Sequence, residues 1–90
     1  MAIKITNSLD WQLASAELRR EVATIKNGSR RLDATRMLNN LDPMITTLSQ
    51  LELLARRSAT HSTRMVDEQL DLINDAVLQF EQWVLLCLLM

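Results

Sequence analysis

The sequence predicts an all-α fold: a helical hairpin or small helical bundle with a long C-terminal amphipathic helix, in an oligomeric protein. The 90 residues include one Gly and one Pro, a scarcity of turn residues that disfavours a sheet. Apolar residues recur at alternating steps of four and three, the spacing of a packed helical seam. Hydrophobic residues make up 48% and aromatics 3%, so we expect one small domain over 1–90 with an aliphatic core.

We expect an N-terminal helical arm over residues 7–41, after a flexible or extended lead over 1–6. Asn7 or Ser8 is a suitable N-cap, and Asp10 in the first turn would complement the helix dipole. Two alternatives remain open at Gly28. Asn27-Gly28-Ser29 would end one helix and let Ser29 cap another, or a kinked helix would continue through Gly28 at a cost of about 1 kcal/mol.

A second arm is expected over residues 43–90. Pro43 disfavours helical geometry in the residue before it but fits the first turn of a new helix, which Asp42 can cap. We therefore predict a tight reversal at Asp42-Pro43 that folds the two arms into a hairpin. The stretch 58–63 is rich in hydroxylated and β-branched residues, so a bend or loop is expected there as well.

The long helix predicted from Met65 to Met90 is the main element of the expected fold. Its apolar seam supplies the residues that we expect to mediate self-association, namely Val66, Leu70, Ile73, Val77, Phe80, Trp83, Val84 and Cys87. From Trp83 onward the helix is apolar all round, and such a helix needs burial on every side. A chain of this size cannot supply that burial alone, so we expect a homo-oligomer.

Charge is divided unevenly along the chain. All ten basic residues and six acids lie in 1–64, whereas 65–90 carry five acids and no base. This asymmetry suits antiparallel folding or subunits that meet by unlike ends. The net charge of −1 argues against a general nucleic-acid binder. A basic surface that contacts double-stranded RNA or DNA is an alternative to intersubunit salt bridges, through Arg19, Arg20, Lys26, Arg30, Arg31 and Arg36.

Catalytic chemistry is not indicated. His61 is the sole histidine, and no Gly-rich turn offers an oxyanion hole or a phosphate cradle. Asp67, Asp71 and Asp75 follow one helix face at steps of four, a pattern more typical of a solvated face than of a cation site. The single Cys87 excludes an internal disulfide. We expect a protein that is not an enzyme, with no cofactor and no metal.

The two ends of the sequence bear on localisation. The start lacks the apolar core of a secretory signal peptide. The last eight apolar residues are too few for a membrane-spanning helix, which needs about 20. We therefore expect a protein made in the cytoplasm, without a membrane span.

The sequence around the predicted helix break at Asp42-Pro43 resembles that of a known family. With Gln50 seven residues after the proline, it resembles the needle subunits of type III secretion systems and their inner-rod relatives, which are short helical hairpins. The segments 7–13 and 70–80 are also similar to the first and last helices of those subunits. Two features depart from the pattern: an apolar tail continues ten residues past Phe80, and Arg56-Arg57 occupies the region where aromatics are usual.

The resemblance implies a subunit of a hollow virulence filament used for protein transport, exported to the cell surface without a cleaved signal peptide. It implies a small helical chaperone or a secretion-apparatus protein as partner. Pro43 would form the turn, and Gln50 a polar contact between neighbours. The apolar tail leaves a second function open, that of a small helical adaptor, chaperone or viral regulator acting as a dimer.

Overall fold

The structure, a computed structural model, describes residues 3–57 and 62–89. These residues form the helices α1 (Asp10–Ala23), α2 (Gly28–Asn39), α3 (Asp42–Arg57) and α4 (Ser62–Leu89), with no strand among them. The predicted all-α fold is therefore confirmed. The molecule is a rod whose Cα atoms extend over 48 × 17 × 16 Å.

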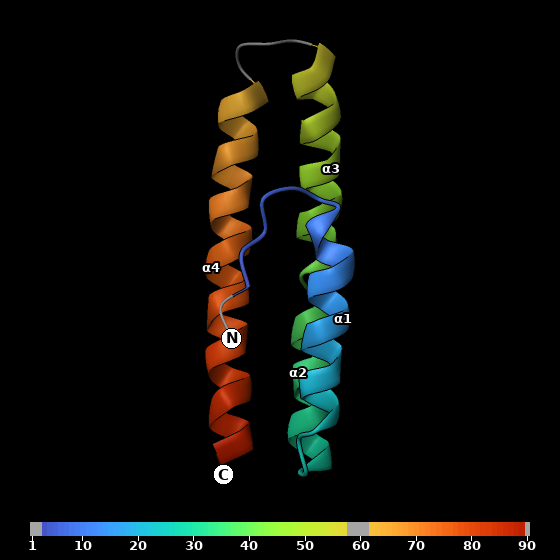
Figure 1. Cartoon of the computed structure of the whole chain (residues 1–90), viewed down its shortest axis with the longest axis vertical. Coiled ribbons are helices and arrows are strands. Elements are labelled where there is room, and N and C mark those ends of the chain that lie inside the picture. Colours follow the sequence, from blue (N-terminus) through green and yellow to red (C-terminus); the bar gives the residue numbers. More distant parts are fainter. Residues whose placement is uncertain (1–2, 58–61, 90) are drawn as a thin grey trace.

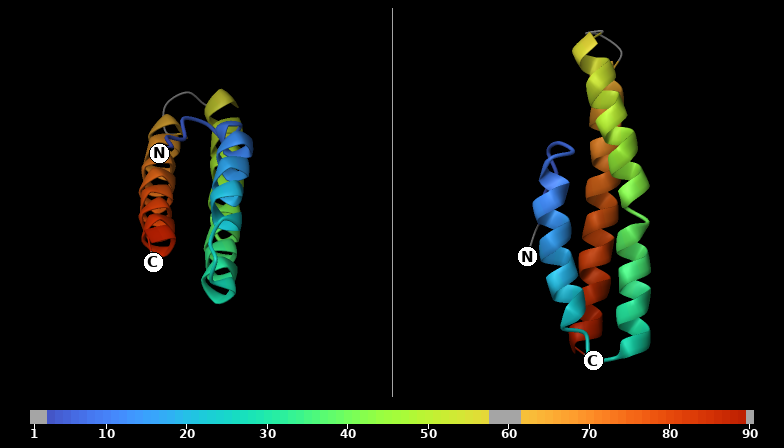
Figure 2. Two further views of the ribbon diagram at one scale, coloured as in Figure 1. Left: turned by 60° about the horizontal axis from the view of Figure 1, so that its bottom comes forward. Right: turned by 90° about the vertical axis from the view of Figure 1, so that its right-hand side faces the viewer.

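The rod is built on a pair of long antiparallel sides (Figure 1). One side consists of α2 and α3, which run end to end in the same direction, and the other is α4. The shorter α1 packs beside both, next to the lower part of the pair, so three helices surround the core there. Above α1, the α3–α4 pair continues without a third helix (Figure 2).

The reversal predicted at Asp42-Pro43 is wrong. The helix is interrupted there, at residues 40 and 41, but α3 continues in the direction of α2. The reason lies in the burial of the flanking residues, because Leu38, Leu41 and Ile45 all belong to the same core. Their helical spacing of three and four keeps one apolar side of both helices facing α4 across the break. Pro43 occupies the first turn of α3, as its missing N–H allows.

The chain reverses instead between Ala23 and Gly28, which settles the alternatives at this position in favour of two helices. Asn27 caps α2, with Oδ1 accepting hydrogen bonds from the backbone N–H groups of Ser29 and Arg30 at 3.0 and 3.1 Å. The predicted cap, Ser29, thus lies inside the helix. Of the predicted weak stretch 58–63, residues 58–61 lie outside the described residues, and Ser62 and Thr63 begin α4.

Of the two alternatives for the N-terminal lead, flexible or extended, the described residues 3–6 take the extended one and lie against α4. Ile5 is 1% exposed. Its N–H donates to Asn74 Oδ1 at 2.7 Å, and its carbonyl accepts from Asn74 Nδ2 at 2.9 Å. The N–H of Ile3 also donates to Glu81 Oε1 at 3.2 Å. Ile5 therefore belongs to the core.

The core follows the contact between α4 and the other helices. Its fully buried large side chains are Ile5, Leu18, Ile25, Leu38, Leu48, Ile73, Val77 and Val84. All are aliphatic, as the composition predicted. Trp11 lies at the edge of this core and donates its indole N–H to Asp42 Oδ1 at 2.9 Å, which ties α1 to the start of α3.

Among the described residues, one helix is long and apolar enough to cross a membrane by length and composition, over Thr63–Leu89. The apolar character extends well upstream of the last eight residues on which the sequence argument depended. A core helix meets the same two criteria, and α4 buries the side that carries Ile73, Val77, Phe80, Val84 and Cys87 against its own chain.

Candidate protein-binding surface

The inner side of α4 is occupied within the chain. Of the residues predicted to mediate self-association, Ile73, Val77, Phe80, Val84 and Cys87 are buried in the core, with exposed fractions of 0–9%. Val66, Leu70 and Trp83 are partly buried and pack against it. The predicted seam is therefore the chain's own core, and an interface with another molecule would have to use other sides of α4.

The outer side of α4 carries exposed leucines over its last three turns, interrupted by the exposed Gln82. Leu78, Leu85, Leu86 and Leu89, here called the outer stripe, are 53%, 57%, 60% and 76% exposed. At 3.6 residues per turn they lie on the side of the helix opposite to the buried seam. For Leu85, Leu86 and Leu89 the signal in the sequence is the loss of polar residues after Gln82, because a helix apolar all round keeps one side uncovered even when the other is packed. Leu78, which precedes Gln82, has no such signal.

Upstream of the outer stripe, the same side of α4 is acidic. Asp67, Asp71 and Asp75 are exposed, and none makes a side-chain hydrogen bond or ion pair within the described residues. Across residues 3–57 and 62–89, the ion pair found joins Arg64 to Glu68 on α4 itself, at 3.2 Å. The uneven charge of the sequence is thus not neutralised by packing α4 against the basic arm. It stays on the surface.

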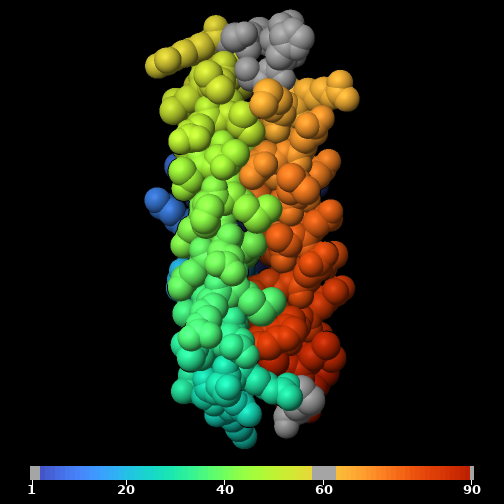
Figure 3. Space-filling model, turned by 180° about the vertical axis from the view of Figure 1, so that it is seen from behind, coloured from blue at the N-terminus to red at the C-terminus, as the bar shows by residue number. Residues whose placement is uncertain are grey.

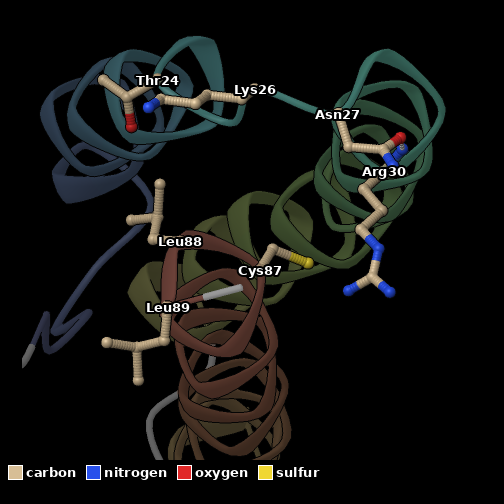
Figure 4. A pocket seen from close by; sticks show the side chains of 7 residues that line it. All are labelled: Thr24, Lys26, Asn27, Arg30, Cys87, Leu88 and Leu89. Atoms are coloured by element: carbon tan, nitrogen blue, oxygen red, sulfur yellow. Dashed lines mark hydrogen bonds between the residues drawn. The ribbon is translucent and has the colours of Figure 1, made fainter.

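The end of α4 meets the α1–α2 connection around a hollow of about 470 Å³ (Figure 4). Lys26 and Asn27 of the connection and Arg30 of α2 line one side, and Cys87, Leu88 and Leu89 the other. Leu88 points toward the end of α1 and Cys87 toward α2, whereas Leu89 points away from both. Leu89 is therefore directed out of the molecule even though its neighbours line the hollow.

A second hollow lies where α1 begins, on the flank of the α3–α4 pair that α1 leaves uncovered. We call it the step; its volume is about 510 Å³, and it is lined by Asn7, Ser8, Leu9, Ser49, Glu52, Leu53, Ala55, Arg56, Thr63 and Val66. Glu52 fixes its lower edge by accepting from the N–H and the hydroxyl of Ser8. Leu9 and Leu53 are 75% and 51% exposed, so the step offers apolar surface to a partner.

From behind, the molecule shows a different face. There α2 and α3 lie against α4 along the length of the rod, and α1 is almost hidden (Figure 3). The face that carries α1 is the opposite one. The step lies beside the N-terminal end of α4 and the outer stripe at its C-terminal end, so the two candidate surfaces lie on different parts of the molecule rather than forming one patch.

The basic residues predicted to contact nucleic acid do not share one site. Arg19 and Arg31 line a hollow between α1 and α2, whereas Lys26 and Arg30 line the hollow at the end of α4. Arg19 donates to Asn39 Oδ1, and Arg31 donates to the carbonyl of Ile25. Arg20 and Arg36 are exposed on α1 and α2. Two of the six are thus engaged in holding the α1–α2 pair together.

Within the described residues, no group of three or more His, Cys, Asp or Glu side chains is placed to hold a metal ion. Cys87 is buried, and His61 lies outside the described residues. The carboxyl of Asp10 has its pKa lowered by hydrogen bonds from the hydroxyl and N–H of Thr6, but it sits on the exposed first turn of α1 and not in a cleft.

No family model, curated protein or solved structure matches this chain. The outer stripe and the step are therefore the two surfaces of this molecule that support a functional proposal.

Proposed function

We propose that the protein is a non-catalytic helical subunit that acts by associating with further copies of itself. The observation that supports this proposal is the outer stripe: four leucines on one side of α4, each more than half exposed, while Val77, Phe80, Val84 and Cys87 on the opposite side are buried. A contiguous apolar surface rimmed by polar residues is typical of a protein–protein interface.

The free energy available from burying the outer stripe is sufficient for a specific interaction. Complete burial of an exposed leucine side chain contributes about 1.5–3 kcal/mol, so the four half-exposed leucines offer a total of about 3–6 kcal/mol. Part of that offsets the lost translational and rotational freedom. The stripe alone therefore favours a weak to moderate, concentration-dependent association, which additional contacts from a second surface would strengthen.

A mass measurement across a concentration series tests the proposal. The wild-type chain should grow from 10.3 kDa with rising concentration. The double variant Leu85→Gln/Leu89→Gln should remain monomeric, because it keeps helix propensity but removes half of the stripe. Leu13→Gln/Leu32→Gln, at positions 77% and 52% exposed on α1 and α2, is the matched control and should behave as wild type. A wild-type chain that stays monomeric throughout would refute the proposal.

A narrower form of the proposal is a filament subunit of a protein-secretion apparatus, exported with the help of a small helical chaperone. Gln50 supports it, since this family-matched residue is exposed and makes no side-chain hydrogen bond within the described residues. The position of Asp42-Pro43 counts against it, because the chain does not turn back there as a needle hairpin does. Electron microscopy of the concentrated protein separates a filament from the discrete dimer that an adaptor or chaperone would form.

A further inference from the structure

We infer that association is head to tail: the end of the outer stripe of one copy docks in the step of the next copy. This inference rests on the proposed self-association and names the two surfaces that carry it. Each surface exposes leucine side chains, each is uncovered in the single chain, and they lie on different parts of the rod.

The step is an unfinished part of the core. Where α1 is present, the facing residues of the long pair are buried, as Leu48, Ile73 and Val77 show with exposed fractions of 0%. Above α1, the corresponding residues Leu51, Ala55, Val66 and Leu70 are only partly buried. The lower half of the rod has a third helix, α1, and the upper half has none. A helix placed in the step would therefore bury the upper residues as α1 buries the lower ones.

The end of α4 is a helix of suitable length and direction for that place. Leu85, Leu86 and Leu89 span roughly 6 Å at 1.5 Å per residue, and the hollow follows α3 from Ser49 to Arg56 for roughly 11 Å. Within one molecule α1 and α4 run in the same direction. An incoming α4 end, seated above the first residues of α1, would therefore continue the line of α1 without turning the neighbouring copy around.

Docking of this kind leaves each copy folded. The side of α4 that would enter the step is the outer one, while Val84 and Cys87 on its inner side stay in their own core. Leu89, at the tip, already points away from α1 and α2 (Figure 4). No residue has to leave a buried position for the contact to form.

The distribution of charge also favours the end of α4 as the segment that docks in the step. The segment from Gln82 to Leu89 carries no charged residue, so its insertion desolvates none. Arg56 at the rim of the step and Arg57 beside it are exposed and make no ion pair within the described residues. With Leu89 level with Ser49, the acidic row of the incoming helix would begin at Asp75, roughly 9 Å beyond Arg57 along the axis. That separation is about one Debye length at physiological salt, so the attraction is modest and sensitive to salt.

An interface between two different surfaces is heterologous, and it leaves one stripe and one step free in every dimer. Further copies can therefore add, giving an open chain or a ring, whereas a stripe-to-stripe contact would stop at a symmetric dimer. This difference makes the inference testable separately from self-association.

The test uses two one-sided variants. The stripe variant is Leu85→Gln/Leu89→Gln, and the step variant is Leu9→Gln/Leu53→Gln, whose positions are 75% and 51% exposed. The double variant Leu13→Gln/Leu32→Gln, at 77% and 52%, is the matched control. Each variant alone and an equimolar mixture of the two one-sided variants are measured by light scattering, at a concentration where the wild type exceeds a dimer.

The expected result is that each one-sided variant is monomeric alone and that the mixture forms a heterodimer and nothing larger. The intact stripe of the step variant then meets the intact step of the stripe variant, which also shows that both are folded. A step variant that dimerises alone, or a mixture that stays monomeric while the wild type assembles, would overturn the head-to-tail inference and leave self-association standing. A monomeric wild type would overturn both.

Discussion

The amide side chain of Asn74 and the carboxylate of Glu81 join the beginning of the described chain to α4. Asn74 accepts from the N–H of Ile5 and donates to its carbonyl, so it satisfies both backbone groups of a residue that is 1% exposed. The extended lead could not otherwise bury Ile5, because an extended segment has no internal partner for its N–H and C=O groups. Asn74 therefore fixes the position of the lead on α4.

Asn74→Ala should lower the free energy of unfolding by about 1–3 kcal/mol, since it leaves the backbone groups of Ile5 without their partners in a partly buried place. Urea unfolding followed by circular dichroism measures this change. Gln79→Ala is the control on the same helix, because Gln79 is exposed and its side chain makes no hydrogen bond in the described structure. Equal effects of the two substitutions would show that the contact to Ile5 contributes nothing.

A second residue-scale prediction concerns pH. The Thr6 hydroxyl and N–H donate to the Asp10 carboxylate and lower its pKa. A carboxyl whose pKa is lowered on folding stabilises the protein above its ordinary pKa, and this contribution is lost as pH falls through the lowered value. Thr6→Val should raise the Asp10 pKa toward its ordinary value, but not completely, because the N–H remains. Carbon NMR titration measures the shift, and Thr35→Val should leave it unchanged.

Neither contact could be predicted from the sequence alone. Asn74 occupies a helix position that suits a solvated polar residue, and its partner lies 69 residues away in the chain. Period and composition place residues on faces of a helix but say nothing about an extended segment that later packs on that face. The sequence therefore leaves the lead as flexible or extended and does not place Ile5 in the core.

At the scale of the elements, the helices themselves were largely predictable. Trp11, Ala14, Leu18 and Val22 recur at steps of three and four along α1, the spacing of one helix face, and these four residues are buried. The spacing of the α4 seam likewise indicated a packed side, but the sequence assigned that side to self-association, whereas most of it is buried within the chain. The direction of the chain at Pro43 was not predicted correctly, because proline reports a helix break and not the angle between the helices on either side. That angle depends on Leu38, Leu41 and Ile45 sharing one core.

Gly28 lies at the start of α2, and its backbone conformation leads to a prediction about stability. No described glycine has a positive φ, so Gly28 is not needed for a left-handed conformation. A Cβ atom at this position would lie 3.7 Å from the nearest atom, Arg31 Nη2, which is an ordinary contact. Gly28→Ala should therefore stabilise the protein by about 0.4–1 kcal/mol by restricting the unfolded chain.

The measurement is a thermal or urea unfolding curve, with Asn27→Ala as the opposing control. Loss of the Asn27 cap should cost about 1 kcal/mol, because the N–H groups of Ser29 and Arg30 lose their acceptor. Destabilisation by Gly28→Ala would contradict the conformation described for the α1–α2 connection.

On the scale of the whole molecule, the packing is uneven along the rod. Three helices enclose the lower part, and two form the upper part. The sequence predicted a long apolar seam but not where a third helix would cover it, since the position of α1 depends on the turn at 24–27. The two candidate surfaces follow from this uneven packing. The step lies where α1 no longer covers the α3–α4 pair, and the outer stripe lies on the side of α4 that no other helix covers.

Amide hydrogen exchange should reveal the unevenness directly. Amides of residues 77–84 of α4, next to α1, should exchange at least about tenfold more slowly than those of residues 65–70, because sparse packing lowers the free energy of local opening. Mass spectrometry of short peptic fragments measures this. Uniform protection along α4 would show that the upper pair is as stable as the lower part. Concentrating the protein should slow exchange at residues 49–57 if the step becomes covered.

The elongated shape of the molecule makes its mode of growth visible in solution. One chain has a Cα radius of gyration of 14.5 Å and a long axis nearly three times its width. If consecutive copies overlap by roughly 15 Å of helix, each addition lengthens the particle by roughly 30 Å and thickens it hardly at all. Small-angle X-ray scattering would then show a cross-section that stays constant while the maximum dimension increases in even increments. Lateral pairing would instead widen the particle at nearly constant length.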